Sequence, residues 1–294
     1  MKSERGLMYA LITLEILILL GVSLLIVVKK VTVQENEQNV QNNQINETQI
    51  EENFLDENLS ENVIEESEAQ IVEELPAVQF SAEIETVLAQ MSVEEKVAQL
   101  FMISPETLTG LERVTIAGEA TSNALMQYPV GGLIYGRQNL MGLVQMGDLI
   151  RGAQKIGMEQ SGRMLFAGAV VQMGETTFIA ISAPGQESAL ANLIALDTEP
   201  QDENIVGMMP ILYIQDLGML TAERDENVLC CYDIANGTQS AVDAINQGVD
   251  MLYTIDSFTS DYEMVIQAVN TGEISENTLK QAVGRILTKK QALS

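Results

Sequence analysis

A short apolar run in this chain ends on two polar side chains that could do chemistry. The run predicts a buried parallel strand over Ile211–Ile214, and Gln215 and Asp216 follow it directly. In α/β barrels and open α/β sheets, catalytic residues lie at the carboxyl ends of such strands. A carboxylate there could act as a nucleophile or as a general acid or base, whereas an amide could not. The function of this strand end therefore depends on which of the two residues occupies the catalytic position, and the amide comes first in the chain.

Other polar residues stand where further strands are expected to end. These are Arg137 after Val130–Tyr135, Glu175 after Arg163–Val171, and Asp256 after Val249–Thr254. We interpret them as the substrate-binding lining of a vestigial cleft rather than as a new catalytic set. The sequence contains no His, which is the commonest metal ligand and the usual general base near neutral pH. We expect no metal site and no cofactor.

The composition excludes some classes of function. The formal net charge is −27, which argues against nucleic acid as a partner because phosphates require Lys and Arg. Aromatic residues make up 4% of the chain and Trp is missing, which weakens a sugar-binding surface built on stacked rings. Cys230 and Cys231 are adjacent and cannot form a disulfide framework. We interpret them as two packed thiols, with a strained vicinal disulfide as the alternative.

The first 75 residues predict an anchor and a spacer. Residues 7–28 are apolar and long enough to span a bilayer, and the run ends on Lys29 and Lys30 without a small-residue cleavage site. We expect an uncleaved transmembrane signal anchor over residues 1–30, although its flanking charges nearly balance and do not settle its orientation. Residues 31–75 contain no Lys or Arg and many Glu, Asn and Gln, which predicts a disordered acidic tether.

Residues 76–294 have the pattern of one globular α/β domain. Strand-like runs alternate with helical ones, which indicates parallel βαβ units. We expect about six strands, over Gln99–Ile103, Val130–Tyr135, Arg163–Val171, Thr176–Ser182, Ile211–Ile214 and Val249–Thr254. Ser92 and Glu95 have the spacing of a helix capping box. The expected fold is a shortened or incomplete TIM-type (β/α) barrel behind the transmembrane helix, with Val171–Pro210 as its least regular part.

Four segments resemble glycoside hydrolase family 3. They are Met91–Met102, Tyr128–Tyr135, Ala241–Leu252 and Ala268–Ser275, and the resemblance covers roughly Phe80–Val170 and Ile211–Leu293. The type that the chain is most similar to is the membrane-anchored or secreted β-N-acetylhexosaminidase of bacteria. The resemblance implies a (β/α)₈ barrel and retaining hydrolysis, in which an Asp attacks the anomeric carbon.

The chain departs from this family at the residues that do its chemistry, as a truncated and degenerate member would. Gln172-Met-Gly-Glu175 stands where the family has an acidic, glycine-rich sugar-binding motif. The His residues of the family's acid/base loop have no counterpart. Gln215 holds the position of the nucleophilic Asp and cannot serve as one. Asp216 is a fallback carboxylate, but successive strand residues point to opposite faces, so we expect it to face away from the site.

Three interpretations stay open, and these departures favour the first, an inactive protein. The first is a pseudoenzyme that acts as a scaffold, a weak glycan binder or a regulator, at the cell membrane with its globular domain outside the cytoplasm. The second is a working β-N-acetylhexosaminidase that hydrolyses O-glycosyl bonds in cell-wall glycans with Asp216 and either Glu175 or Asp256. The third is a decayed gene product without a role of its own. A cell-wall glycan or a membrane protein is the expected partner.

Overall fold

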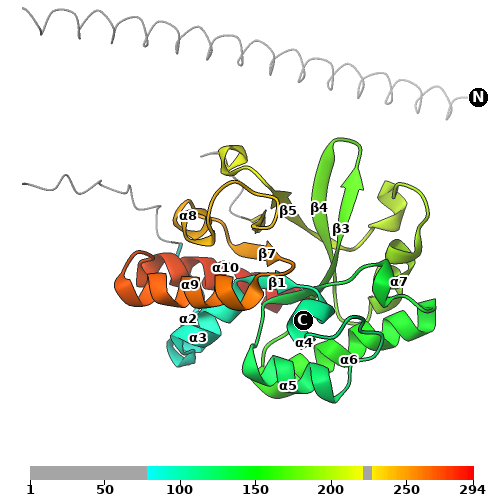
Figure 1. Cartoon of the computed structure of the whole chain (residues 1–294), viewed down its shortest axis with the longest axis horizontal. Helices are drawn as coiled ribbons and strands as arrows, with labels where there is room; N and C mark the ends of the chain where they lie inside the picture. The colour runs from blue at the N-terminus through cyan, green and yellow to red at the C-terminus, as the bar shows by residue number, and fades with distance from the viewer. Residues whose placement is uncertain (1–77, 221–226) are drawn as a thin grey trace, which may run out of the picture. The chain divides into compact units, whose positions relative to one another are not determined.

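The computed structural model describes residues 78–220 and 227–294, and the strands in these residues close into a barrel (Figure 1). The strands follow one another around the barrel in sequence order. They are β1 (Phe101–Ile103), β2 (Gly132–Ile134), β3 (Phe166–Met173), β4 (Thr176–Ser182), β5 (Met209–Ile214), β6 (Cys230–Asp233) and β7 (Met251–Thr254). The last strand pairs with the first, with Leu252 opposite Phe101, and this pairing closes the ring.

One strand of the barrel runs against the other six. Strands β5, β6, β7, β1, β2 and β3 pair in parallel in that order, whereas β4 is antiparallel to β3 and to β5. Only Gly174 and Glu175 connect β3 to β4. Gly174 has φ +58°, which suits the first central position of a two-residue hairpin turn. Because a parallel crossover needs a dozen or more residues, β4 must return alongside β3.

The predicted fold class is wrong. We expected an incomplete TIM-type (β/α) barrel behind a transmembrane helix, and the structure has a closed, mixed barrel of seven strands. The break in the β/α alternation falls inside Val171–Pro210, but the chain there forms an ordered hairpin and a helix, α7 (Glu187–Ala195). The sequence-based count of six strands missed β6. This strand has four residues and no alternation of apolar and polar side chains, so no periodicity marks it.

Two groups of helices surround the barrel. One group contains α2 (Ala82–Gln90), α3 (Val93–Gln99), α8 (Ala241–Asn246), α9 (Phe258–Thr271) and α10 (Glu276–Leu293). The other contains α4 (Pro105–Thr109), α5 (Glu119–Gln127), α6 (Leu143–Ser161) and α7, and the two groups cover different sides of the barrel (Figure 1). The capping box of α3 is confirmed: Ser92 Oγ accepts from the Glu95 N–H, and the Glu95 carboxylate accepts from the Ser92 N–H.

Two of the predictions concern the beginning of the chain. The transmembrane anchor was predicted over residues 7–28 and the acidic tether over residues 31–75. Both segments lie outside the described residues. Among the helices that the structure does describe, none combines the length and the apolar character needed to cross a bilayer.

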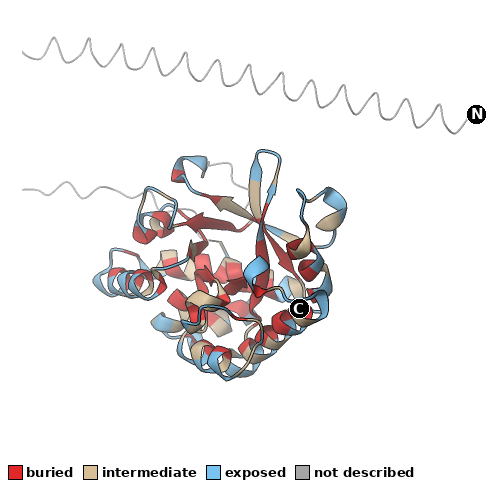
Figure 2. Cartoon of the chain, turned by 45° about the vertical axis from the view of Figure 1, so that its right-hand side comes forward, coloured by how far each residue is buried: buried red, intermediate tan, exposed pale blue. Residues whose placement is uncertain are grey.

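The strands bury one face inside the barrel and the other against the helices (Figure 2). Phe101 marks the outer face, because its ring packs edge-on against Phe258 of α9 with the ring centroids 5.3 Å apart. Its neighbour Met102 therefore points into the barrel, since successive side chains of a strand alternate. The strand registers place Phe166 and Ile179 on the same inner face, and all three side chains are fully buried. They form the apolar filling of the barrel.

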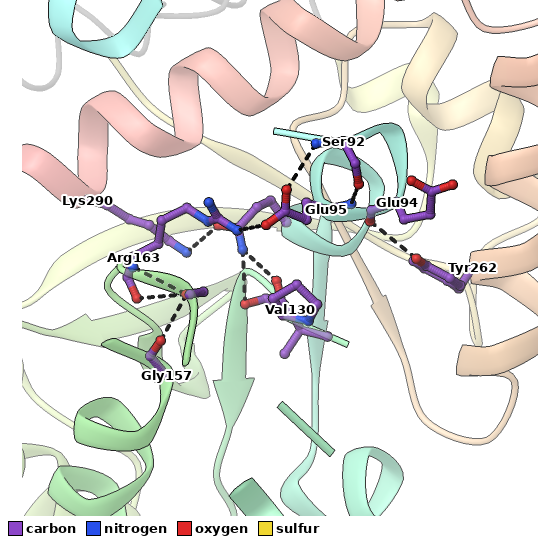
Figure 3. A network of polar contacts seen from close by, with 11 residues as sticks. Ser92, Glu94, Glu95, Val130, Gly157, Arg163, Tyr262 and Lys290 are labelled. Atoms are coloured by element: carbon purple, nitrogen blue, oxygen red, sulfur yellow. Dashed lines mark hydrogen bonds and ion pairs between the residues drawn. The ribbon is translucent and has the colours of Figure 1, made fainter. Parts of the chain in front are cut away.

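A lysine from the last helix closes the amino end of the barrel (Figure 3). Lys290 is 3% exposed; its Nζ lies 5.0 Å from the centroid of the Phe166 ring and donates to Gln99 Oε1 at 2.8 Å. Arg163 lies nearby and donates to Glu95 Oε1 at 2.6 Å. Burial, together with the positive charge of Arg163, lowers the pKa of Lys290 well below its usual range. The floor of the barrel thus disfavours the charged form of Lys290.

We expect Lys290→Met to reduce the pH dependence of stability. Because the folded-state pKa of Lys290 is lowered, the unfolded chain binds its proton more tightly. The stability linked to this group is therefore complete above the ordinary lysine pKa of 10.5 and is lost as the pH falls toward the folded-state value. This group alone contributes a slope of up to about 1.4 kcal/mol per pH unit. Urea unfolding at a series of pH values below 10.5 measures the slope.

The control for this prediction is Lys155→Met. The Lys155 side chain is 73% exposed, so its replacement should leave the slope of the wild-type protein unchanged. Equal slopes for wild type and Lys290→Met would show that the buried lysine keeps an ordinary pKa.

Candidate functional site

Four polar side chains gather inside the barrel at the carboxyl ends of β5, β6 and β7. Tyr213 is paired with Cys231, and Asp233 with Tyr253. Paired residues of parallel strands point to the same face, and residues two apart share that face. Tyr213, Gln215, Asp233 and Tyr253 therefore all belong to the inner face. The rings of Tyr213 and Tyr253 are in edge contact, with centroids 5.9 Å apart. We call these four residues the barrel mouth.

Asp233 is the centre of the barrel mouth. It is fully buried, and its Oδ2 accepts from the Tyr213 hydroxyl at 2.5 Å, from Asn236 Nδ2 at 2.7 Å and from Gln215 Nε2 at 3.1 Å. Its Oδ1 accepts from the Asn236 N–H at 3.2 Å. A carboxylate offers about two acceptor positions on each oxygen, so Oδ2 is fully occupied whereas Oδ1 accepts one bond. Asp233 thus ties β5 to the loop that leads from β6 to α8.

The surroundings of Asp233 keep the neighbouring groups protonated. Burial raises the pKa of Tyr213, and the hydrogen bond to Asp233 and its negative charge raise it further. Burial and the charge of Asp233 likewise raise the pKa of Tyr253. The Cys231 thiol lies inside the barrel, and burial first, then Cys230 and Asp233, raise its pKa well above the usual range. These groups can donate hydrogen bonds near neutral pH, but none is poised to act as a base or nucleophile.

The two residues that first suggested chemistry have different roles. Gln215 donates its amide to Asp233 and so faces the barrel mouth. Asp216 instead caps the short 3₁₀ helix η3 (Leu217–Met219), because its Oδ1 accepts from the Gly218 N–H at 2.9 Å. Gln215 and Asp216 are both exposed. The strand end therefore presents an amide to the barrel interior and uses its carboxylate for a local turn.

The structure does not bring the other three candidate residues together. Arg137 lines a groove of about 560 Å³ and is paired with Asp197 at 2.6 Å. Asp256 lines a different groove, of about 710 Å³, on the side of β1 and β7. Glu175 stands at the exposed tip of the β3–β4 hairpin. The geometry joins none of these residues to Asp233.

Sequence reasoning missed Asp233 because it missed the strand that carries it. Leu229–Tyr232 is a short apolar run that ends on a carboxylate, the same pattern as Ile211–Ile214 before Gln215. That similarity was the available signal. The two cysteines of this strand are both buried and form no disulfide, as the packed-thiol interpretation predicted. Their side chains point to opposite faces of the barrel wall.

The described residues of the barrel mouth do not include the pair of carboxyl groups on which a retaining glycosidase depends. Such an enzyme needs two carboxyl groups about 5–5.5 Å apart, one of them a nucleophile with a free lone pair. Asp233 is the only carboxylate among the described inward-facing strand residues at this end of the barrel. Nor do the described Cys, Asp and Glu side chains form a group of three or more that could hold a metal ion.

Comparisons with known proteins find similar solved structures only. No known protein family and no curated protein matches the chain. A glycoside hydrolase family 3 β-N-acetylglucosaminidase from Paenibacillus sp. str. FPU-7 is 15% identical, with a TM-score of 0.45 over 68% of this chain and 62% of that chain. An exo-1,3/1,4-β-glucanase from a Pseudoalteromonas species is 14% identical, with a TM-score of 0.49 over 74% of this chain and 43% of that chain. M tuberculosis LpqI is 13% identical, with a TM-score of 0.37 over 72% of this chain and 97% of that chain.

These values do not assign the chain to a family. The identities and the TM-scores are low, and the chain spans 62% and 43% of the lengths of the first two proteins. The chemistry of the barrel mouth must therefore be judged from its own residues.

Proposed function

We propose that this domain is a non-hydrolytic, glycoside hydrolase family 3-like barrel that binds cell-wall glycan weakly, as a scaffold or as a regulator of an active relative. One observation carries this proposal: the only inward-facing carboxylate of the described barrel mouth, Asp233, accepts four hydrogen bonds from Tyr213, Gln215 and Asn236, three of them at Oδ2. Hydrogen bonds from these donors stabilise the carboxylate and make it a weaker nucleophile. The second amide N–H of Gln215 and the two tyrosine rings offer a polar, ring-lined surface to a sugar.

The contacts at the strand ends do not favour the alternative of a working glycosidase. That alternative requires Asp216 to act together with Glu175 or Asp256. Asp216 caps η3, Glu175 lies at the hairpin tip, and Asp256 lines a groove beside β7. No described contact joins any two of these carboxylates.

The proposal predicts no hydrolysis. With a chromogenic N-acetylglucosaminide, the purified full chain should give no turnover above the buffer rate, because Gln215 holds the family's nucleophile position and the chain contains no His. Asp216→Asn and Asp233→Asn should give the same background rate as the wild type. Turnover by the wild-type chain that either substitution abolishes, while the variant still unfolds cooperatively, would establish a working glycosidase.

The glycan-binding part of the proposal has its own test. Soluble cell-wall fragments at about ten times their Kd would stabilise the folded chain by about 1.4 kcal/mol. That corresponds to a rise in Tm of about 3–6 °C for a domain of this size. An unchanged Tm across a series of fragments would eliminate glycan binding and favour a scaffold that contacts protein.

The location of the domain is also part of the proposal. We place it outside the cytoplasm at the cell membrane, on the basis of the sequence of residues 7–28 and the resemblance to anchored hexosaminidases. Recovery of the full chain in the soluble fraction of its own cells, without cleavage, would contradict this placement.

A further inference from the structure

Among the described strands, the longest is β3, and part of its edge has no partner strand there. β3 runs to Met173, but its pairing with β2 ends where Ile134 lies opposite Gly168. The last backbone hydrogen bond between the two strands is the one that Tyr135 N–H donates to the Gly168 carbonyl at 2.8 Å. Beyond it, β3 and β4 continue as a hairpin that rises above the rest of the barrel (Figure 1).

The geometry of the hairpin determines which backbone N–H and C=O groups of β3 point away from β4. A two-residue turn is closed by a hydrogen-bonded pair, here Met173 and Thr176. The groups of Ala169, Val171 and Met173 therefore point toward β4, and those of Gly168, Val170 and Gln172 toward the β2 side. Gly168 uses its groups with β2. Within the described residues, no hydrogen bond involves the backbone N–H or C=O of Val170 or Gln172 on that side.

A groove runs along this free edge. It has a volume of about 560 Å³, and β3 residues from Ala169 to Gly174 line one of its walls. The opposite wall is formed by the end of α7 and the residues that follow it, among them the apolar Leu193, Leu196 and Pro200. The groove is therefore an open strand edge that faces an apolar wall.

Two side chains fix the far wall at a set distance from the strand. At the end of β2, the Arg137 guanidinium donates to the carbonyls of Ala195 and Leu196 and pairs with Asp197. At the hairpin tip, a Glu199 carboxylate oxygen accepts from the Gly174 N–H. The groove is thus built before any ligand enters, which lowers the entropic cost of binding.

The edge also lacks the usual protection against strand pairing. Natural proteins guard exposed edges with Pro, with Lys, with bulges or by covering them. The upper part of β3, Ala169–Met173, contains neither Pro nor Lys, and Val170 is 40% exposed. An edge that is open, regular and partly apolar is suited to a partner strand.

We propose that the free edge of β3 binds a short extended peptide, which pairs with Val170 and Gln172 as an added strand. The edge from Ala169 to Met173 is about 16 Å long, room for a peptide of about five residues. Backbone hydrogen bonds would supply the affinity, and apolar side chains on alternate residues would face the wall around Leu193 and Leu196.

The charges around the groove specify the peptide further. Of the described residues that line it, Arg137 and Glu199 are charged, and two more carboxylates are adjacent: Asp197, which pairs with Arg137, and Glu175, which follows the lining residue Gly174. An extended peptide that alternates apolar with basic residues fits this balance, whereas an acidic peptide is repelled. The site differs from the barrel mouth in position and in ligand, so the proposal does not depend on the proposed function.

The test uses the full chain and the peptide acetyl-Lys-Val-Thr-Val-Lys-amide. The peptide should bind and should slow hydrogen exchange in the segment that contains Val170 and Gln172, as measured by mass spectrometry. Gln172→Pro removes one edge N–H and blocks the approach of a strand, so it should weaken binding about tenfold or more. An acidic peptide, acetyl-Glu-Val-Thr-Val-Glu-amide, should bind more weakly than the basic one.

Thr177→Pro is the matched control. Thr177 is opposite Gln172 in the hairpin, but its N–H points away from β3 toward the β5 side. This variant should bind the peptide as the wild type does, and thermal unfolding should show that both variants fold. The proposal is overturned if the basic peptide does not bind, or if Thr177→Pro weakens binding as much as Gln172→Pro does. It is also overturned if the wild-type chain forms a dimer that Gln172→Pro dissolves, because the occupant is then a second copy.

Discussion

Asp250→Asn is expected to lower the free energy of unfolding by about 3–5 kcal/mol. The Asp250 side chain is completely buried; its Oδ1 accepts from Arg285 Nε at 2.5 Å, and its Oδ2 accepts from the Cys230 N–H at 2.7 Å. An asparagine would leave the Arg285 guanidinium, itself 16% exposed, without its counter-charge. It would also turn an NH₂ group toward one of the two donors. Both effects leave polar groups buried without a partner.

The size of this effect follows from what Asp250 connects. It lies directly before β7, it holds the first residue of β6, and its partner Arg285 belongs to α10. One carboxylate thus joins two neighbouring barrel strands to the helix that closes the chain. Urea unfolding measures the loss directly, and the expected fall in Tm is about 10 °C.

The control for Asp250 is an exposed ion pair. Asp148 pairs with Arg151 at 2.8 Å, with both side chains more than half exposed. Pairs of this kind contribute about 0–1 kcal/mol, so Asp148→Asn should have little effect. If the two asparagine variants lose the same stability, the buried pair adds no more than a surface pair and our account of Asp250 is wrong.

Gly131→Ala is the second substitution with a large expected effect, about 3 kcal/mol of lost stability. A Cβ at Gly131 would lie 2.1 Å from the Gln99 carbonyl oxygen and 2.7 Å from the Met251 Cε. The methionine end could move, but the carbonyl belongs to the backbone that leads from α3 into β1. That backbone is buried, so relief requires a shift of the strand itself.

The position of Gly131 explains why the strand cannot shift cheaply. The Gly131 N–H donates to the Ala98 carbonyl at 3.1 Å, and its carbonyl accepts from the Phe166 N–H at 3.1 Å. One residue therefore connects α3, the start of β2 and the start of β3. We expect loss of stability rather than of a single contact, and denaturant unfolding with circular dichroism would measure it.

Gly147→Ala is the matched control, because it makes the same chemical change in open space. A Cβ at Gly147 of α6 would meet only the Ser188 Oγ, at 3.9 Å. Alanine is the better helix former by about 1 kcal/mol, so this variant should be as stable as the wild type or more so. Equal losses for the two alanine variants would rule out crowding at Gly131 as the cause.

The sequence by itself determined the features that depend on near neighbours along the chain. The Ser92–Glu95 capping box and the strand that leads into Gln215 followed from residue type and spacing within a few residues. The lack of His excluded an imidazole acid/base without any structure. These features were predictable because hydrogen bonds of caps and the periodicity of apolar residues are local.

Only the tertiary structure decided how distant residues meet. It closed the barrel through β1 and β7, and it placed Lys290 against Gln99, 191 positions away along the chain. It also showed that Asp233, not Asp216, is the carboxylate inside the barrel mouth, with Tyr213 and Asn236 among its donors. The number of hydrogen bonds that a carboxylate accepts depends on donors from other strands and loops. No local sequence pattern predicts which strands become neighbours.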